Sequence, residues 1–389
     1  ALATQLQAER GNPVGGFEEA SPRVLPLRFT ASGSEYFRIW VVNLLLTVVT
    51  LGLYLPFARA RQLRYFHENT LIDGAPLAFH GDPWKMLRGY LIIGAALLIY
   101  LAGSQFAPLL AAGAALLGTL AWPWLLCSAL RFRLGQTSWR GLRFGFVGTV
   151  AEAYRVFLPL IVLLGTVLAL SPILAPDAPA EGELAAPPVW LIGLFLTAML
   201  GLYACGPWIL LRLMRYRLDH CTFAGEQSRL EGVRVRDLWK LGAKSMLLMI
   251  AAGLGIGLLS MAASMVLPPA MFVLGPLAYL ALVTLMMAYS GARMQNLLWN
   301  HVRSRHLSFA SQLSFSALWG LLLKNAVLTG LTLGLYWPFA AVAAARMKLE
   351  AMSITTDCPV EHFLGTPATR EPGAIGEAAD DLLGIDVAF

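Results

Sequence analysis

The sequence has few charged residues and few cysteines for its length. Only 13% of its 389 residues are charged, whereas 57% are apolar. A soluble domain usually carries about twice that charged share, so this balance excludes a disordered chain, a collagen and an ordinary soluble enzyme. The four cysteines form no Cys-x-x-Cys pair, so neither a disulfide framework nor a zinc site is expected. The first 38 residues show no cleavable signal peptide.

Long apolar segments are the main feature that is present. A membrane helix needs about 20 mostly apolar residues. Eight segments approach that length: 39–57, two within 90–130, 153–175, 189–211, 242–267, 269–290 and 317–340. The six central segments predict six firm transmembrane helices in three hairpins. We therefore expect an all-α polytopic membrane protein with small cytoplasmic β-hairpins between the spans.

The basic residues lie on one side of these segments. Four regions, 58–89, 131–155, 212–244 and 291–315, hold 21 of the 29 Lys and Arg residues. The intervening turns are uncharged or acidic. Because Lys and Arg are retained in the cytoplasm during membrane insertion, the basic loops are predicted to be cytoplasmic.

The first and last apolar segments repeat each other. Residues 43–58 and 325–340 are identical at eleven of sixteen positions, and a Pro is followed eight residues later by Arg four times in the chain. Such repeats usually mean one structural unit used several times. The units lie near 36–82, 90–146, 153–230, 242–310 and 317–365, within a single membrane domain over 28–365. Residues 1–27 and the acidic stretch 366–389 are expected to be disordered.

The repeat leaves two topologies open for the terminal segments. In one, all eight segments span the membrane and the last copy is inverted. In the other, both terminal segments are bent or re-entrant, which places their hairpins on one face. Gly52 and Pro56 weaken a straight helix and slightly favour the second topology. Asp73-Gly74 between two short apolar runs predicts a type I′ turn in the first of these hairpins.

Two sets of polar residues are candidate sites. An intramembrane set occupies equivalent positions in the two copies: Asn43, Thr47 and Thr50, with Asn325, Thr329, Thr332 and the neighbouring Lys324. This stripe is expected either to bond neighbouring helices or to line a solute path. A basic set follows the prolines: Arg59, Arg61, Arg64, Arg131, Arg133, Arg212, Arg215, Arg217 and Arg346. It predicts topology anchoring on anionic headgroups, or a ring that gathers an anionic ligand or lipid.

The sequence contains no recognisable catalytic, metal-binding or phosphate-binding motif. The six histidines form no His-Glu-x-x-His pattern, and no nucleophile elbow or phosphate loop occurs. The sequence therefore predicts no enzyme, no metal site and no cofactor. The membrane surface explains the basic pattern, so no nucleic-acid partner is expected. Membrane lipids are the expected partners, and the oligomeric state stays open.

One group of residues carries a family resemblance. It consists of Phe29, Glu35-Tyr36-Phe37-Arg38-Ile39-Trp40, Asn43, Thr50-Leu51-Gly52-Leu53-Tyr54, Pro56, Arg64-Tyr65-Phe66, Asn69-Thr70, Asp73-Gly74 and Phe79-His80-Gly81. These residues resemble the YjgN-like family of bacterial inner-membrane proteins, over about residues 28–365. The chain departs from the family in its glycine-poor entry at 31–34. It departs again in the final copy, where Ala341 and Ala343 replace Arg59 and Arg61.

The resemblance implies a multi-pass protein of the bacterial inner membrane and a domain of unknown function. It implies no reaction. Genes of the family tend to lie near a zinc membrane metallopeptidase, so such an enzyme is a candidate partner. The expected function is a non-enzymatic scaffold or accessory protein. The alternative is a channel or transporter for a small or anionic solute or lipid.

Overall fold

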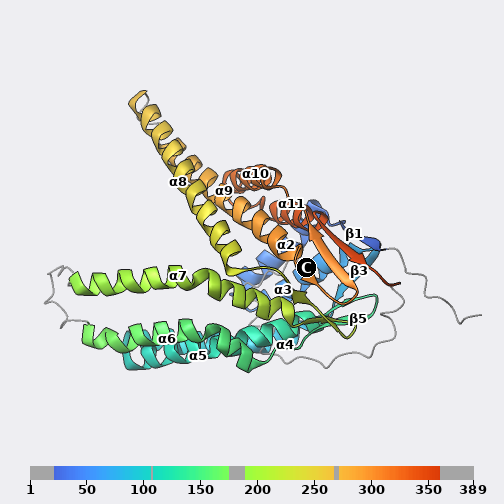
Figure 1. Ribbon diagram of the computed structural model, residues 1–389, viewed down its shortest axis with the longest axis horizontal. Helices are drawn as coiled ribbons and strands as arrows, with labels where there is room; N and C mark the ends of the chain where they lie inside the picture. The colour runs from blue at the N-terminus through green and yellow to red at the C-terminus, as the bar shows by residue number, and fades with distance from the viewer. Residues whose placement is uncertain (1–21, 107, 175–188, 267–270, 360–389) are drawn as a thin grey trace, which may run out of the picture.

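A computed structural model describes residues 22–106, 108–174, 189–266 and 271–359. Within these ranges the chain forms one eleven-stranded sheet and ten α-helices (Figure 1). The strands are β1 (Arg23–Phe29), β2 (Thr70–Ile72), β3 (Ala75–Phe79), β4 (Thr137–Trp139), β5 (Leu142–Phe146), β6 (Cys221–Phe223), β7 (Glu226–Gln227), β8 (Arg229–Leu230), β9 (Val302–Arg303), β10 (Leu307–Ser311) and β11 (Met352–Thr356). The helices are α2 (Gly33–Val49), α3 (Leu55–Glu68), α4 (Pro83–Phe106), α5 (Pro108–Gln136), α6 (Val150–Leu174), α7 (Val189–Asp219), α8 (Val235–Val266), α9 (Met271–Trp299), α10 (Phe315–Leu331) and α11 (Trp337–Glu350).

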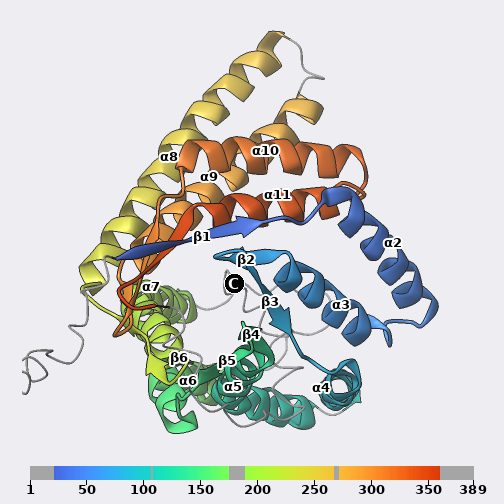
Figure 2. The same ribbon diagram turned by 90° about the vertical axis from the view of Figure 1, so that its right-hand side faces the viewer.

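The connections follow one rule around the molecule. A pair of helices leaves the sheet after one strand and returns to the neighbouring antiparallel strand, as α2 and α3 do between β1 and β2. Four further pairs repeat this arrangement, and short turns link the strands at the opposite end. All five helix pairs therefore project from one end of the sheet (Figures 1 and 2).

The sheet curls into a nearly closed barrel. Its strand order is β7-β6-β5-β4-β3-β2-β1-β11-β10-β9-β8, so β1 pairs with β11 and joins the first described strand to the last. The seam lies between β7 and β8, which only Ser228 separates in sequence. Helix α11 packs on α2 and closes the ring of helices in the same way (Figure 2).

Large apolar side chains fill the inside of the barrel. In β1 the buried Leu25, Leu27 and Phe29 alternate with outward residues, the two-residue period of a strand. They pack in one cluster with side chains from distant strands, including Trp139 and Ile354. A cavity of about 120 Å³ remains among these aromatic and aliphatic groups of the described residues. Small barrels are commonly filled by side chains in this way.

The all-α prediction is wrong, because the short segments between the helices form this continuous sheet. The predicted separate cytoplasmic hairpins are wrong for the same reason, since each one pairs with at least one neighbouring strand of the continuous sheet. The type I′ turn itself is confirmed, with φ of 51° at Asp73 and 76° at Gly74. Residues 23–27, which the sequence assigned to a disordered N-terminus, lie in β1. Pro26 and two arginines interrupt the apolar run there and hide the alternation.

Each terminal apolar segment reverses direction instead of continuing as one helix. In the first, the Gly52 N–H donates to Thr47 O over 2.8 Å and the Leu51 N–H donates to Val48 O over 3.1 Å. These two bonds form a Schellman motif, which ends α2 and turns the chain into α3. The bonds recur between α10 and α11, where the Gly334 N–H donates to Thr329 O over 2.7 Å.

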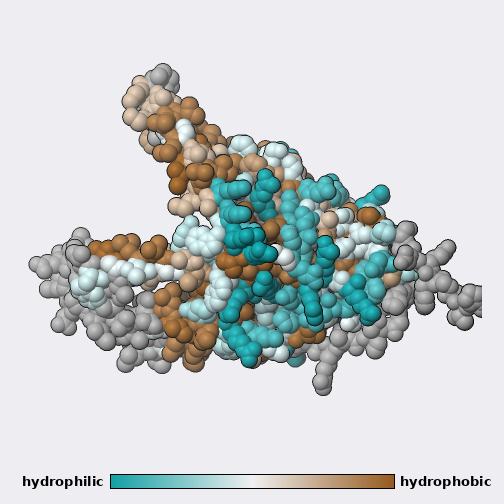
Figure 3. Space-filling model, in the orientation of Figure 1, coloured by the Kyte–Doolittle hydropathy of each residue, from teal (hydrophilic) through white to brown (hydrophobic). Residues whose placement is uncertain are grey.

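The longer helix pairs provide the membrane-crossing part. Among the described residues, five helical stretches are long and apolar enough to span a membrane: Pro83–Gly103, Gly113–Gln136, Leu196–Asp219, Val235–Ala263 and Phe272–Trp299. The predicted sixth span, 153–175, lies in α6 up to Leu174, where the described range ends, and is not among these five. Apolar surface covers the projecting arms, whereas polar surface surrounds the strands (Figure 3). The expected disorder over 1–21 and 366–389 lies outside the described residues, as does the end of the last predicted unit, 360–365.

Candidate functional site

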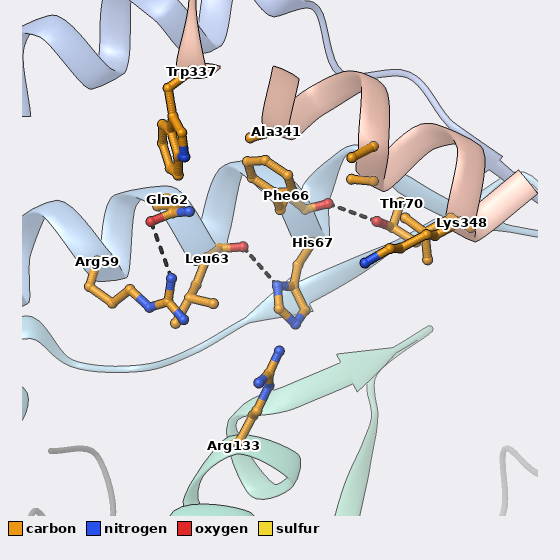
Figure 4. Close-up of a pocket in the computed structure, with 13 residues that line it drawn as sticks. Arg59, Gln62, Leu63, Phe66, His67, Thr70, Arg133, Trp337, Ala341 and Lys348 are labelled. Atoms are coloured by element: carbon orange, nitrogen blue, oxygen red, sulfur yellow. Dashed lines mark hydrogen bonds between the residues drawn. The ribbon is translucent and has the colours of Figure 1, made fainter. Parts of the chain in front are cut away.

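A cavity of about 380 Å³ lies where the helices meet the sheet. It opens between the facing sides of α3 and α11, and Arg133 near the end of α5 closes one wall (Figure 4). The described residues that line it are Arg59, Gln62, Leu63, Phe66, His67, Thr70, Arg133, Trp337, Ala341, Ala344, Ala345, Lys348 and Leu349. The charged members of this set are all cationic.

The helical repeat explains how these side chains come together. On α3 the lining residues recur every three or four positions, the spacing that keeps residues on one helix face. On α11 the corresponding face carries alanines. Ala341 stands at the position of Arg59, and Ala344 stands at the position of Gln62. The two repeated helices thus present large polar groups opposite small ones, and this difference leaves room for the cavity.

His67 is a neutral member of the cavity wall. Its Nδ1 lies 2.7 Å from Leu63 O, one turn earlier on the same helix, so Nδ1 carries the hydrogen and donates it. Nε2 is then an acceptor and lies 3.4 Å from Thr137 Oγ1. Burial is the main reason that the pKa of His67 falls from 6.5 to about 4, and the nearby Arg133 and Arg59 charges lower it further.

The three cations differ in how they are held. Arg133 is only 6% exposed, which places its charge well inside the protein. Arg59 Nη1 donates to Gln62 Oε1 over 3.3 Å, so these two side chains form one polar group on α3. Lys348 lies at the exposed edge of the cavity on α11 (Figure 4). Arginine forks suit phosphate and carboxylate oxygens, whereas a lysine supplies a mobile point charge.

A second cavity, of about 520 Å³, continues from the first toward the hairpin formed by α2 and α3. The two cavities share Arg59, Gln62 and Trp337. The remaining lining residues of the second are Tyr36, Trp40, Asn43, Leu44, Thr47, Leu55, Ala58 and Tyr90. A cationic chamber thus adjoins a chamber with aromatic and aliphatic walls.

The predicted intramembrane polar residues mostly bond to nearby backbone. Asn43 Nδ2 donates to Ala58 O, and Asn325 Nδ2 donates to Ala340 O, both over 3.4 Å. Thr47 donates to Asn43 O over 2.7 Å, one turn earlier on the same helix. Equivalent bonds join Thr50 to Leu46 O and Thr332 to Leu328 O. The two remaining members of the set, Thr329 and Lys324, are half-buried and exposed, respectively.

The predicted basic residues separate into several environments. Only Arg59 and Arg133 line the cavity. Arg131, Arg215 and Arg346 donate to the backbone carbonyls of Gly148, Val233 and Ala31, respectively. The others lie elsewhere on the return helices: Arg61 donates to Asn43, Arg212 stacks on Trp208, Arg64 is exposed and Arg217 is half-buried.

Of the residues that line the cavity, sequence reasoning predicted Arg59 and Arg133 as site residues; those it missed include Gln62, His67, Trp337 and Lys348. Helical spacing could have found two of them. Gln62 lies three residues after Arg59, and His67 lies four residues after Leu63, so each shares a helix face with a residue that lines the cavity. Lys348 and Trp337 face them only because α3 and α11 are brought together in space.

A sequence profile described as "Bacterial protein of unknown function (DUF898)" matches residues 24–382. The chain belongs to this family. It is also similar to the Inner membrane protein YjgN of Salmonella typhimurium, at 31% identity over 141 residues, which are 36% of this chain and 35% of the relative. The YjgN protein of Escherichia coli K12 is 30% identical over 142 residues, or 35% of each chain. No solved structure matches the chain.

These matches confirm the resemblance to the YjgN-like family. Each matched region spans about a third of the relative's length. With its membrane-length helices, the chain is a multi-pass protein of the bacterial inner membrane.

Proposed function

We propose that this protein is a non-enzymatic membrane scaffold that binds an anionic phospholipid headgroup in the cavity between α3 and α11. The observation that carries the proposal is the convergence of Arg59, Arg133 and Lys348 on one chamber. The guanidinium groups would hold the phosphate oxygens, and Lys348 would neutralise the remaining charge from the exposed edge. Anionic lipids are concentrated in the cytoplasmic leaflet, which the predicted sidedness would present to this end of the helices.

The second cavity supports a lipid rather than a free anion. It shares three residues with the cationic chamber and adds Tyr36, Trp40 and Leu44. Tryptophan and tyrosine prefer the headgroup level of a membrane, where an apolar ring and a polar edge are both satisfied. A phospholipid would place its phosphate against Arg59 and the start of its glycerol and acyl region along these rings.

The packed barrel favours a scaffold over a channel. Trp139, Phe223 and Phe309 lie around the remaining interior space of about 120 Å³. A solute path along the barrel axis would require these side chains to separate. The membrane metallopeptidase stays a candidate client of the scaffold, to be tested by co-purification of the two proteins from one membrane.

The test is calorimetric titration of the detergent-solubilised protein with short-chain phosphatidylglycerol and with phosphatidylcholine of the same chain length. We expect the anionic lipid to bind more tightly. Arg59→Gln and Arg133→Gln should each weaken its binding by about tenfold or more, because a charge-assisted hydrogen bond contributes about 1.5–3 kcal/mol. Inorganic phosphate in parallel titrations separates a headgroup site from a free-phosphate site.

The matched control is Arg64→Gln, which removes the same charge from an exposed position on the same helix. If a buried arginine proves necessary for folding, Lys348→Gln tests the same site, because Lys348 lies at the exposed edge of the cavity. This variant should also weaken binding of the anionic lipid. Equal binding of the two lipids, or equal losses in Arg64→Gln and the cavity variants, would contradict the proposal.

A further inference from the structure

Three side chains that can bind metals lie together at the turn end of the barrel, opposite the end from which the helices project. His306 lies in the turn between β9 and β10, and Asp357 and Cys358 directly follow β11. One ligand atom from each residue lies within 4.8 Å of the other two. They unite an imidazole nitrogen, a carboxylate oxygen and a thiol sulfur.

The strand register holds these residues together. Leu307 of β10 pairs with Thr356 of β11. His306 and Asp357 are the next residues beyond that pair, so they lie opposite each other at the end of the sheet. The Asp357 N–H donates to His306 O over 3.3 Å, and His306 Nδ1 lies 2.8 Å from Asp357 Oδ1. Thr356 Oγ1 accepts from the Cys358 N–H over 3.3 Å, and this bond folds the chain back after β11.

A second carboxylate lies on the other side of the imidazole. Glu226 Oε1 is 3.6 Å from His306 Nε2, while Glu226 Oε2 accepts from Ser304 Oγ over 3.1 Å. Histidine ligands of metals usually pass their other ring N–H to a carboxylate, which fixes the tautomer and orients the ring. Glu226 is in position for that role when Nδ1 faces the metal.

We propose that His306 Nδ1, Asp357 and Cys358 form a binding site for Zn²⁺, with Glu226 orienting the histidine. The mixed N, O and S set suits zinc, whereas Mg²⁺ and Ca²⁺ prefer oxygen ligands throughout. Three protein ligands leave a fourth tetrahedral position for water or another ligand. Tetrahedral zinc–ligand bonds of about 2.0–2.3 Å separate the ligand atoms by about 3.3–3.6 Å. The 2.8 Å contact between His306 and Asp357 would therefore widen slightly, and the widest separation in the cluster, at most 4.8 Å, would shorten.

The site lies beside the seam of the barrel, so zinc binding should stabilise the seam. Glu226 belongs to β7, on one side of the seam, whereas His306 and Asp357 lie next to β10 and β11, which belong to the part of the sheet on the other side. Zinc would order the histidine that Glu226 contacts and so fasten the seam. A ligand that binds only the folded state raises its stability, so zinc should also raise the melting temperature.

The test is zinc titration of the full-length, metal-free protein in detergent, in competition with a chromogenic chelator. We expect one Zn²⁺ per chain, and Cys358→Ser and Asp357→Asn should weaken its binding by about 100-fold, whereas Glu226→Gln should weaken it by about tenfold. Asp357 is 58% exposed, so Asp357→Asn should leave the fold intact. Co²⁺ in place of Zn²⁺ should show thiolate-to-metal charge-transfer absorption.

The matched control is Cys205→Ser, which removes an exposed thiol on α7 outside the cluster. This control should retain the affinity and the charge-transfer band. The proposal is overturned if no zinc binds, if Cys358→Ser and Asp357→Asn bind zinc as the unaltered protein does, or if Mg²⁺ binds equally well.

Discussion

The two copies of the terminal repeat differ at individual residues, and those differences create the cavity. Arg59 and Gln62 on α3 correspond to Ala341 and Ala344 on α11, and all four line the same space. The shared residues have shared roles: Asn43 and Asn325 are both buried and both bond the return helix of their own hairpin. The repeat thus gives both hairpins the same backbone bonds, and the residues that differ between the two copies shape the cavity.

The loss of Arg61 from the second copy leaves a buried acceptor without its counterpart. Asn43 Oδ1 accepts from Arg61 Nη1 over 3.4 Å. Ala343 stands at that position in the second copy, and Asn325 Oδ1 has no partner within the described ranges. We expect Ala343→Arg to supply the missing donor and raise stability by about 1 kcal/mol. Thermal unfolding in detergent measures the change, with Arg61→Ala expected to lower stability; a lower melting temperature for Ala343→Arg would contradict the prediction.

His67 should make stability depend on pH. Its folded pKa of about 4 lies below the unfolded value of 6.5, so the unfolded state binds more protons between these two pH values. Stability is therefore lost as pH falls from about 6.5 to 4, by up to about 3 kcal/mol. His67→Gln should flatten the curve of melting temperature against pH in this window. Parallel curves for the two proteins would show that another group controls the acid response.

At the scale of elements, the two short helix pairs end in exposed apolar tips. Leu51 and Leu333 each have a φ of 51° and are each 95% exposed. A left-handed conformation costs a leucine about 1 kcal/mol, and glycine usually occupies this position of a Schellman motif. An exposed leucine at a strained position has a clear advantage only where the surroundings are apolar. We infer that both tips enter the lipid without crossing it.

Cysteine accessibility tests this inference. Leu51→Cys and Leu333→Cys, in a background without native cysteines, should resist a water-soluble maleimide in right-side-out and in everted vesicles. Arg229→Cys, on the exposed end of β8, should react in only one of the two preparations. We expect that to be the everted one, because the basic regions are predicted to be cytoplasmic. Fast labelling of either tip would place the short hairpins in water.

At the scale of the whole molecule, arginines join consecutive units. Arg131 Nη2 donates to Gly148 O over 2.8 Å, and Arg215 Nη2 donates to Val233 O over 3.0 Å, at the start of the next helix pair in each case. Arg346 Nη2 reaches Ala31 O over 2.6 Å, which links the last unit to the first. The arginine that follows each proline thus has a structural role in these three units.

Arg346→Gln should therefore weaken the closure of the ring. The lost charge-assisted bond contributes about 1–2 kcal/mol at a partly exposed site, and β1 should loosen together with β11. Hydrogen exchange measured by mass spectrometry should show faster exchange in both strands. Arg64→Gln, at the equivalent position of the first copy, should leave the hydrogen exchange of both strands unchanged. Unchanged exchange in Arg346→Gln would assign the closure to strand pairing alone.

The sequence by itself determined the membrane class, the family, the repeats and the turn at Asp73-Gly74. Each of these depends on local composition, spacing or identity: apolar runs are long, and two residues suffice for a type I′ turn. Arg59 and Arg133 were also within reach, because their basic setting after a proline is local.

Only the tertiary structure decided the sheet, the cavity and the cluster of His306, Asp357 and Cys358. Ten of the eleven strands have only two to five residues, which is too short for a clear alternating pattern, and in β1 Pro26 and the arginines hide it. Each strand that precedes a helix pair meets its partner only after the chain has left the sheet and returned. Arg59 and Lys348 line one cavity because β1 pairs with β11, and His306 meets Asp357, 51 residues away, because β10 pairs with β11. Contacts of this kind depend on how distant segments pack, so no local pattern could encode them.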